Sequence, residues 1–429
     1  MFKIKKFIDL AVMISFILLL NPHMASAYLD PSAGNALIYI AVTMTSVAAY
    51  AAKGLFYKLS GKKDYEHESN AYNDIAIFSE GKSYVNTFMP VVNALINKEK
   101  YFSYYTLDIE DPILKIRNKF LKRRYLGEGS AAFAKLNRTP CKVMLATTPN
   151  IGTPGYPMPR PAKTEFLVHV FHDPDGSIGY YKKGSLDNYD AVITPGDYAI
   201  ESIRYIENLR NLKAKEIISL GLPYWDIMLK NNNNNLNNNA KKTVLLAPSW
   251  GDKGFMANYD LKFIKDLSLD FNIIFRPHPQ SKKFEPELLN QAKDLIKSIP
   301  NAIWDEEIDP SSSLNNSDIL ISDTSAIRMD YAVIYKKPVI SLEVNYKNIA
   351  SFEAADMPEE LRANADKFSV KVKSSEIKNI KQIIKTTLYN QANQAGVLTA
   401  ENNIANLGTA GGHIADYLIL KSREITERE

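Results

Sequence analysis

The stretch that indicates the fold most clearly is DILISDTSAIRMDY, over residues 318–331. Its apolar run, residues 319–321, has the composition of a short strand buried on both faces of a sheet. Small hydroxyl residues follow the run, and a helical stretch begins at Ala326. A strand, a turn and a helix in this order form the repeating step of a parallel α/β sheet. Hydroxyl groups at such a helix start can bind a phosphate, although they can equally cap the helix.

The same step recurs along the chain, in two series of strands that an asparagine-rich tract separates. We predict strands over residues 74–78, 142–146, 166–171, 190–193 and 216–220, and again over 243–247, 272–275, 302–304, 319–321 and 339–342. The tract over residues 231–239 is asparagine except for Leu236, so it is unsuited to a core and reads as a linker. We therefore expect an α/β protein with two facing Rossmann-like domains, built on parallel sheets. The expected boundaries are 70–230 for the first domain, 231–240 for the linker and 241–400 for the second domain.

The composition excludes several classes of protein. The 429 residues include 52 Lys+Arg and 48 Asp+Glu, which gives a net charge of +4, and 45% are apolar. This balance is that of a globular protein and lacks the strong basic excess of a dedicated nucleic-acid binder, so we expect no nucleic-acid partner. The single Cys141 excludes an internal disulfide framework and a cysteine-rich metal site. We assign no metal ligands.

The N-terminus carries two apolar segments that predict a membrane location. Lysines precede an apolar run at residues 10–20, and Ala-Ser-Ala follows at 25–27, so residues 1–27 are expected to be a signal peptide or a first membrane helix. Residues 28–63 are expected to form a transmembrane segment, uncharged over 31–52, with a lysine-rich flank. An interfacial or buried helix is the alternative for this second segment. The flank places the rest of the chain on the cytoplasmic face of the cell membrane by the positive-inside rule.

Three predicted strands of the second series end in unusual residues. The loops read APSWGD at residues 247–252, RPHP at 276–279 and SDTS at 322–325. Ligands of parallel sheets bind beyond the carboxyl ends of the strands, so these loops are expected to meet around one anionic group, which we predict to be a diphosphate. His278 can donate to a phosphate or transfer a proton. The candidate residues for binding this group are Arg276, Ser322, Asp323, Thr324, Ser325 and Ser249.

These segments resemble the CDP-glycerol glycerophosphotransferase family, which includes polymerases and primases of teichoic-acid synthesis. The similar stretches lie within residues 240–345: LAPSW at 246–250, FRPHP at 275–279, DILISDTS at 318–325, DYA at 330–332 and KPVI at 337–340. The resemblance implies a GT-B fold, in which the first domain binds the acceptor and the second binds the nucleotide donor. It also implies that His278 contacts the donor diphosphate, with Ser322, Thr324 and Ser325 around it.

The family also uses a histidine at a strand end in its first domain. Here the corresponding segment reads VHVFHDPDG over residues 168–176, and the resemblance points to His172, while His169 is expected to lie within the strand. The Gly-Thr-Pro that follows this histidine in the family is absent. Asp173 or Asp175 could orient His172, or could coordinate a cation. No cofactor is assigned, and a divalent cation remains open.

The expected activity is transfer of glycerol phosphate from CDP-glycerol to a hydroxyl of a membrane-anchored or lipid-linked acceptor, with His172 and His278 as catalytic residues. The expected partners are CDP-glycerol or another nucleotide-activated donor, the acceptor and the membrane. Two alternatives stay open: a GT-B glycosyltransferase that uses a nucleotide sugar, and a non-catalytic scaffold protein of a polymer-assembly complex. Residues 401–429 are expected to form a helix that packs back across the domains.

Overall fold

The structure, a computed structural model, describes residues 73–231, 241–307, 309–344, 350–393 and 404–428. They lie in one compact unit, residues 66–429. The predicted signal peptide and transmembrane segment fall outside the described residues. Among the helices of the described ranges, none is both long and apolar enough to cross a bilayer.

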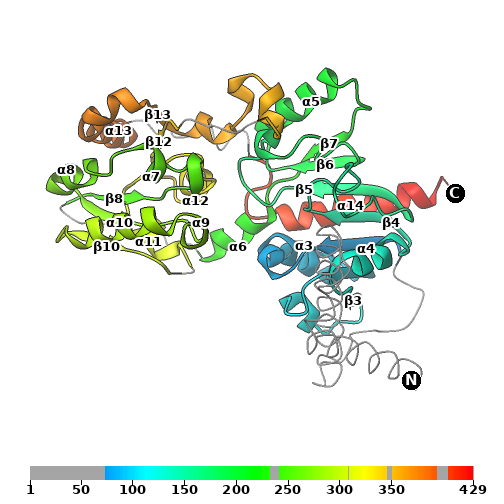
Figure 1. The fold of residues 1–429 in the computed structure, drawn as a ribbon. Coiled ribbons are helices and arrows are strands. Elements are labelled where there is room, and N and C mark those ends of the chain that lie inside the picture. Colours follow the sequence, from blue (N-terminus) through cyan, green and yellow to red (C-terminus); the bar gives the residue numbers. More distant parts are fainter. Residues whose placement is uncertain (1–72, 232–240, 308, 345–349, 394–403, 429) are drawn as a thin grey trace, which may run out of the picture. The chain divides into compact units, whose positions relative to one another are not determined.

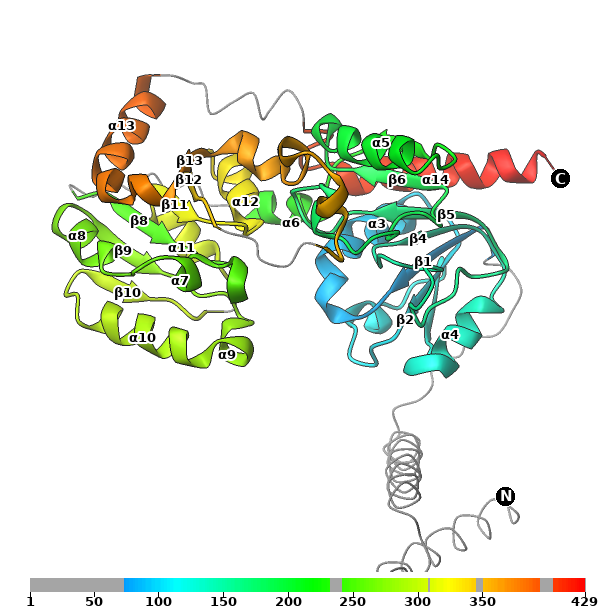
Figure 2. The ribbon, with the colours of Figure 1, turned by 45° about the horizontal axis from the view of Figure 1, so that its top comes forward.

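The first sheet contains seven parallel strands in the order β3-β2-β1-β4-β5-β6-β7. Its strands are β1 Ile75–Ser79, β2 Phe102–Thr106, β3 Leu121–Tyr125, β4 Cys141–Ala146, β5 Thr164–Val170, β6 Ala191–Thr194 and β7 Glu216–Ser219. The strands β1, β2 and β6 are buried along their whole length because helices cover both faces of the sheet, as Figures 1 and 2 show. The chain builds outward from β1 in one direction and then from β4 in the other, so the order of the strands reverses between these two.

The second sheet repeats this topology with six parallel strands, in the order β10-β9-β8-β11-β12-β13. Its strands are β8 Thr243–Leu246, β9 Asn272–Phe275, β10 Ala302–Trp304, β11 Ile319–Ser322, β12 Val339–Leu342 and β13 Val370–Val372. The reversal here falls between β8 and β11. Two such sheets confirm the predicted α/β fold with two Rossmann-like domains.

The helices that accompany the sheets follow from apolar residues at helical spacing. They are α3 Val85–Asn97, α4 Gly129–Asn137, α5 Ile200–Leu209, α6 Pro223–Asn231, α7 Phe255–Asn258, α8 Phe263–Asp270, α9 Ser281–Phe284, α10 Pro286–Lys297, α11 Ser311–Asn316, α12 Ile327–Ile334, α13 Ile380–Asn393 and α14 Ala410–Thr426. In α10, Leu289, Ala292 and Ile296 form one buried stripe. In α12 most of the side chains are buried, which places this helix in the interior.

The helix α14 returns to the first sheet and packs against α3 (Figure 2). Its residues Ile414, Ala415 and Leu418 belong to the same buried cluster as the strands β1 and β4. A side chain at Gly411 would come within 2.5 Å of Pro90 in α3, so the close approach of the two helices requires a glycine there. The carboxylate of Asp226 in α6 accepts hydrogen bonds from the backbone N–H groups of Ala410 and Gly411, which fixes the start of the helix.

The predicted strands agree with the structure within one or two residues at their ends, but three strands were not predicted. These are β2, β3 and β13. β2 reads FSYYT and β3 reads LKRRY, so neither is the continuous aliphatic run expected of a buried parallel strand. β3 and β13 lie at the edges of their sheets, where one side is unpaired and polar residues are tolerated.

Candidate active site

The residues that follow the central strands converge where each sheet reverses its order, because parallel strands end at one common edge. In the first sheet, Glu80 follows β1, Thr147 follows β4 and His172 lies just beyond β5. In the second sheet, Ser249 lies beyond β8 and the segment 323–325 follows β11 directly. Such reversal points are where open α/β sheets bind their ligands.

His172 lies at the end of β5 with its ring partly buried. Its Nδ1 atom lies 3.0 Å from the Thr147 hydroxyl, and its ring meets the Tyr84 ring edge-on with centroids 5.2 Å apart. Burial lowers the pKa of His172, and the charge of Glu80 opposes this lowering. When Nδ1–H donates to Thr147, Nε2 carries a lone pair, so this ring can accept a proton near neutral pH.

His169 has a different environment, as its position within β5 predicts. The side chain is fully buried among Phe171, Tyr181 and Tyr189, whose rings lie 5.1–5.9 Å from it. Neither ring nitrogen has a hydrogen-bond partner among the residues described. Burial, followed by the charge of His172, lowers the pKa of His169 to about 3. His169 is therefore a neutral core residue.

The two aspartates after His172 bind backbone N–H groups. Asp173 accepts hydrogen bonds from the N–H groups of Asp175 and Gly176, and Asp175 accepts from those of Ser177, Asn364 and Ala365. Their carboxylates thus fix the loop and join it to residues 364–365. In the described part of the chain, His, Cys, Asp and Glu side chains form no group of three or more that could hold a metal ion.

Most of the predicted donor-binding residues are close together, and several of them hold the loops in place. Asp323 is 1% exposed and accepts hydrogen bonds from the N–H groups of Ser249 and Phe255. Burial raises its pKa. The hydroxyls of Ser249 and Thr324 lie 2.9 Å apart, and Ser322 donates to the carbonyl of Ala247. These contacts bring the first and third loops together beyond β8 and β11.

Two further members of the predicted donor-binding set are Ser325 and His278. Ser325 is held through its backbone, since its N–H donates to Asp323 at 3.3 Å and its carbonyl accepts from Arg328. His278 follows β9, and its Nδ1 accepts a hydrogen bond from the N–H of Gln280 at 3.2 Å. Neutral His278 must then carry its proton on Nε2, which makes that nitrogen a donor suited to a phosphate oxygen. Burial lowers the pKa of His278, and the nearby Lys253 lowers it further.

Arg276 follows β9 directly, and its guanidinium pairs with groups that follow β10. Its Nη1 atom forms an ion pair with Asp305 at 2.5 Å, and its Nη2 atom donates to the carbonyl of Glu307. Both charged side chains of this pair are about nine-tenths buried, at 12% and 10% exposure. Arg276 thus ties the end of β9 to the segment after β10.

Lys253 is a cation in the loop after β8, and the sequence analysis did not predict a role for it. It ends the 3-10 turn Gly251–Lys253, and its Nζ atom lies 5.1 Å from the centre of the Trp250 ring. Its backbone carbonyl accepts from Ser249 and Thr324, and burial lowers the pKa of its ammonium group. A signal was present in the sequence, because the lysine closes the loop that begins at Ser249.

Arg328 is a second missed residue, one helical turn after Ser325. Its guanidinium is 2% exposed and donates to the Ser341 hydroxyl at 2.7 Å and to Asp366 at 2.6 Å. It lines a cavity of about 380 Å³ beyond β11 and β12. The polar lining of this cavity includes Thr324, Arg328, Ser341, Glu359, Arg362 and Lys371.

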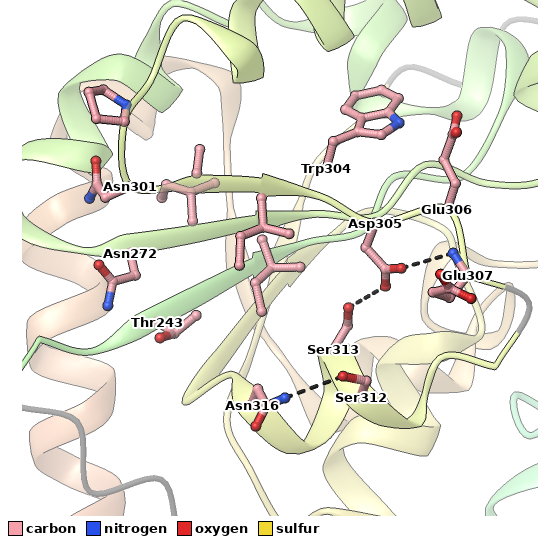
Figure 3. A pocket seen from close by; sticks show the side chains of 15 residues that line it. Thr243, Asn272, Asn301, Trp304, Asp305, Glu306, Glu307, Ser312, Ser313 and Asn316 are labelled. Atoms are coloured by element: carbon pink, nitrogen blue, oxygen red, sulfur yellow. Dashed lines mark hydrogen bonds between the residues drawn. The ribbon is translucent and has the colours of Figure 1, made fainter.

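A larger cavity, of about 660 Å³, lies beside β9, β10 and α11 (Figure 3). Asp305, Glu306 and Glu307 line it, and Figure 3 shows Asp305 bonded to Ser313 and to the N–H of Glu307. This lining is acidic and is displaced from the reversal of the sheet between β8 and β11. It is therefore poorly suited to an anionic donor.

The fold is of the GT-B-like class, with two Rossmann-like domains. A putative UDP-N-acetylglucosamine 2-epimerase from Listeria monocytogenes matches with a TM-score of 0.54 and 12% identity, over 84% of this chain and 98% of that one. The UDP-GlcNAc 2-epimerase from Methanocaldococcus jannaschii matches with a TM-score of 0.51 and 15% identity, over 82% and 100%. A variant of the wall teichoic acid polymerase TagF aligns over 83% of this chain and 90% of its own, with 17% identity and a TM-score of 0.49. At these identities the likeness concerns the fold alone.

A comparison of the sequence with models of protein families gives a match. Residues 178–350 match the family described as CDP-Glycerol:Poly(glycerophosphate) glycerophosphotransferase. This match confirms the resemblance and the expectation of a CDP-glycerol glycerophosphotransferase-type enzyme. His278 and the loop 322–325 lie inside the matched range, whereas His172 lies just before it. No curated protein matches the chain.

Proposed function

We propose that this protein transfers glycerol phosphate from CDP-glycerol to a hydroxyl of a membrane-anchored polymer or a lipid-linked acceptor, as in the synthesis of teichoic-acid-like polymers. The family match supports the donor and the reaction type. The two apolar runs and the lysine-rich flank in residues 1–63 support membrane association, with the domains on the cytoplasmic face.

One structural connection carries the proposal. The loop after His172 is bonded to a segment that also holds Arg328 of the donor side. Asp175 accepts from the N–H of Ala365 at 2.8 Å, and the next residue, Asp366, accepts from Arg328 at 2.6 Å. A single short turn, Asn364–Phe368, thus contacts both the acceptor-side loop and the donor-side guanidinium.

The reaction then follows from the groups at the two reversal points. His172 accepts the proton of the acceptor hydroxyl through Nε2. The acceptor oxygen forms a bond to the β-phosphorus of CDP-glycerol, and the bond from this phosphorus to the bridging oxygen breaks, so that CMP leaves with the electron pair. His278 Nε2–H, Ser325 and Lys253 stabilise the negative charge on the phosphates.

The donor side needs placed charges because the chain as a whole is nearly neutral, at +4. Lys253 and Arg328 supply cationic charge at the ends of β8 and β11, and the backbone of the 323–327 turn adds N–H groups at the start of α12. Arg276 holds the loop that carries His278 through its pair with Asp305.

The test is nucleotide release by the purified full chain, given CDP-glycerol or UDP- and GDP-sugars with a lipid-linked acceptor. We expect CMP release from CDP-glycerol only, and only with the acceptor present. Turnover of a nucleotide sugar would favour the glycosyltransferase alternative. Binding of CDP-glycerol without CMP release would favour the scaffold alternative. Recovery of the full chain with membranes, and of a variant lacking residues 1–63 in the supernatant, tests the location.

A further inference from the structure

Glu80 is an acidic residue at the first reversal point, and neither the motifs nor the proposed function give it a role. It follows β1 directly, and β1 pairs with β4, whose end carries Thr147, the hydrogen-bond partner of His172. Two tyrosines surround it. The Tyr156 hydroxyl donates to Glu80 Oε1 at 3.4 Å, and Tyr84, four residues further on, meets the His172 ring edge-on.

The charge of Glu80 reaches both tyrosines and the histidine. Burial and then Glu80 raise the pKa of Tyr84, and the same two causes raise that of Tyr156 to about 12. Both phenols therefore stay protonated and act as hydrogen-bond donors near neutral pH. Glu80 is also the group that counteracts burial at His172.

The other groups that face His172 do not supply negative charge. From β4 comes the hydroxyl of Thr147, from the turn after β1 comes the neutral Tyr84, and from its own strand comes His169, a neutral residue. Asp173, next in the chain, directs its carboxylate to the N–H groups of residues 175 and 176. Glu80 is thus the acidic side chain available to a positively charged His172 in the described site.

A partly buried base has to accept a positive charge when it takes a proton, and burial opposes that charge. A nearby carboxylate lowers this cost and acts most strongly in the transition state, when the charge develops. We propose that Glu80 is the positioning residue for His172. Its carboxylate stabilises the protonated form of His172 as the acceptor hydroxyl is deprotonated. The inference rests on the proposed function. The proton resides on His172 Nε2.

The experiment compares the full chain with its Glu80→Gln variant, and with Glu110→Gln as the control. Glu110 is an exposed carboxylate paired with Lys82 on the same edge of the domain. NMR of isotope-labelled histidine, assigned with a His172→Ala variant, gives the pKa of His172 without any need for turnover. CMP release gives kcat, KM and their pH dependence.

We expect the pKa of His172 to fall in Glu80→Gln and to stay unchanged in Glu110→Gln. In Glu80→Gln, kcat should fall by about tenfold or more, with KM for CDP-glycerol within about twofold, and the acidic limb of kcat/KM should move to lower pH. Glu80→Asp should restore part of kcat. An unchanged pKa of His172 or an unchanged kcat in Glu80→Gln would overturn the inference. A lower melting temperature of this variant with the same pKa of His172 would overturn it as well.

The two hypotheses fail in different ways. If the wild-type chain releases no CMP from CDP-glycerol, the proposed function fails. The NMR titration then still shows whether Glu80 and His172 are coupled.

Discussion

Trp225 donates a hydrogen bond from its indole nitrogen to the carboxylate of Asp330, 2.7 Å away, and Tyr224 donates to the same oxygen. Trp225 is buried in α6, which follows the first sheet, and Asp330 lies in α12 of the second. Asp330 is half-buried, and burial raises the pKa of its carboxyl group from 3.8 to about 6. This contact therefore couples the packing of α6 on α12 to pH.

The variant Asp330→Asn tests whether this contact lowers or raises the free energy of unfolding as the pH rises. Between pH 3.8 and about 6 the folded protein binds more protons at Asp330 than the unfolded chain, so this group makes stability fall as pH rises through the window. Asparagine keeps an oxygen acceptor and carries no charge. We expect equal stability at low pH, and above about pH 7 a gain for the variant of up to about 3 kcal/mol. Urea unfolding at several pH values measures the difference, and a gain that does not depend on pH would contradict it.

Removal of the His172 imidazole should separate chemistry from binding. In His172→Ala we expect CMP release to fall by about 10²- to 10⁴-fold, because the base is lost. CDP-glycerol affinity, measured by calorimetry, should be nearly unchanged, since His172 does not line the donor loops. Turnover at the wild-type rate would exclude His172 as the base.

His278 should affect both properties. Its Nε2 atom carries the N–H donor when Nδ1 accepts from Gln280. We therefore expect His278→Ala to weaken CDP-glycerol binding and to lower kcat. His278→Gln, which keeps an N–H donor without a titrating group, should retain more of the binding. Equal affinity for wild type and His278→Ala would exclude the contact with the diphosphate.

Lys253 and Arg276 offer a matched comparison of two cations. Lys253→Met removes a charge beside His278 and should raise the Kd for CDP-glycerol by about ten- to hundredfold. Arg276→Met removes the cationic partner of the largely buried Asp305 and should cost roughly 2–4 kcal/mol of stability, with the Kd changed by less than about threefold. Calorimetry and urea unfolding of both variants check this. A large rise in the Kd for Arg276→Met with little change for Lys253→Met would indicate that Arg276, and not Lys253, contacts the donor.

The strands could be predicted where their residues are all aliphatic, because such a run indicates burial on both faces. β8 and β11 are short aliphatic runs covered on both faces, and the sequence shows them plainly. β2 and β3 were missed because their tyrosines, serine, lysine and arginines look like surface residues. In the structure the β2 side chains are buried between helices, although the tyrosine hydroxyl of Tyr104 needs Asp111 as its partner.

The location of the site could be predicted, but the partner of each side chain could not. The rule that ligands bind at strand ends placed the loops around Ser249, His278 and Thr324 together. The role of Asp323 depends on Ser249, 74 residues away in sequence, and that of Arg276 on Asp305, 29 residues away. Such pairings arise only when the chain folds, so a motif shows which groups are present and not which of them remain free for a ligand.

The packing of α14 has a consequence for synthesis of the protein. The side chains of Ile414 and Leu418 belong to the core beside β1, although more than 300 residues separate them from that strand in the chain. A ribosome makes both sheets before it makes this helix. The second domain can therefore fold during translation, whereas the first must wait with an exposed apolar face until α14 emerges. Chaperone binding to nascent chains should accordingly persist until α14 has left the ribosome.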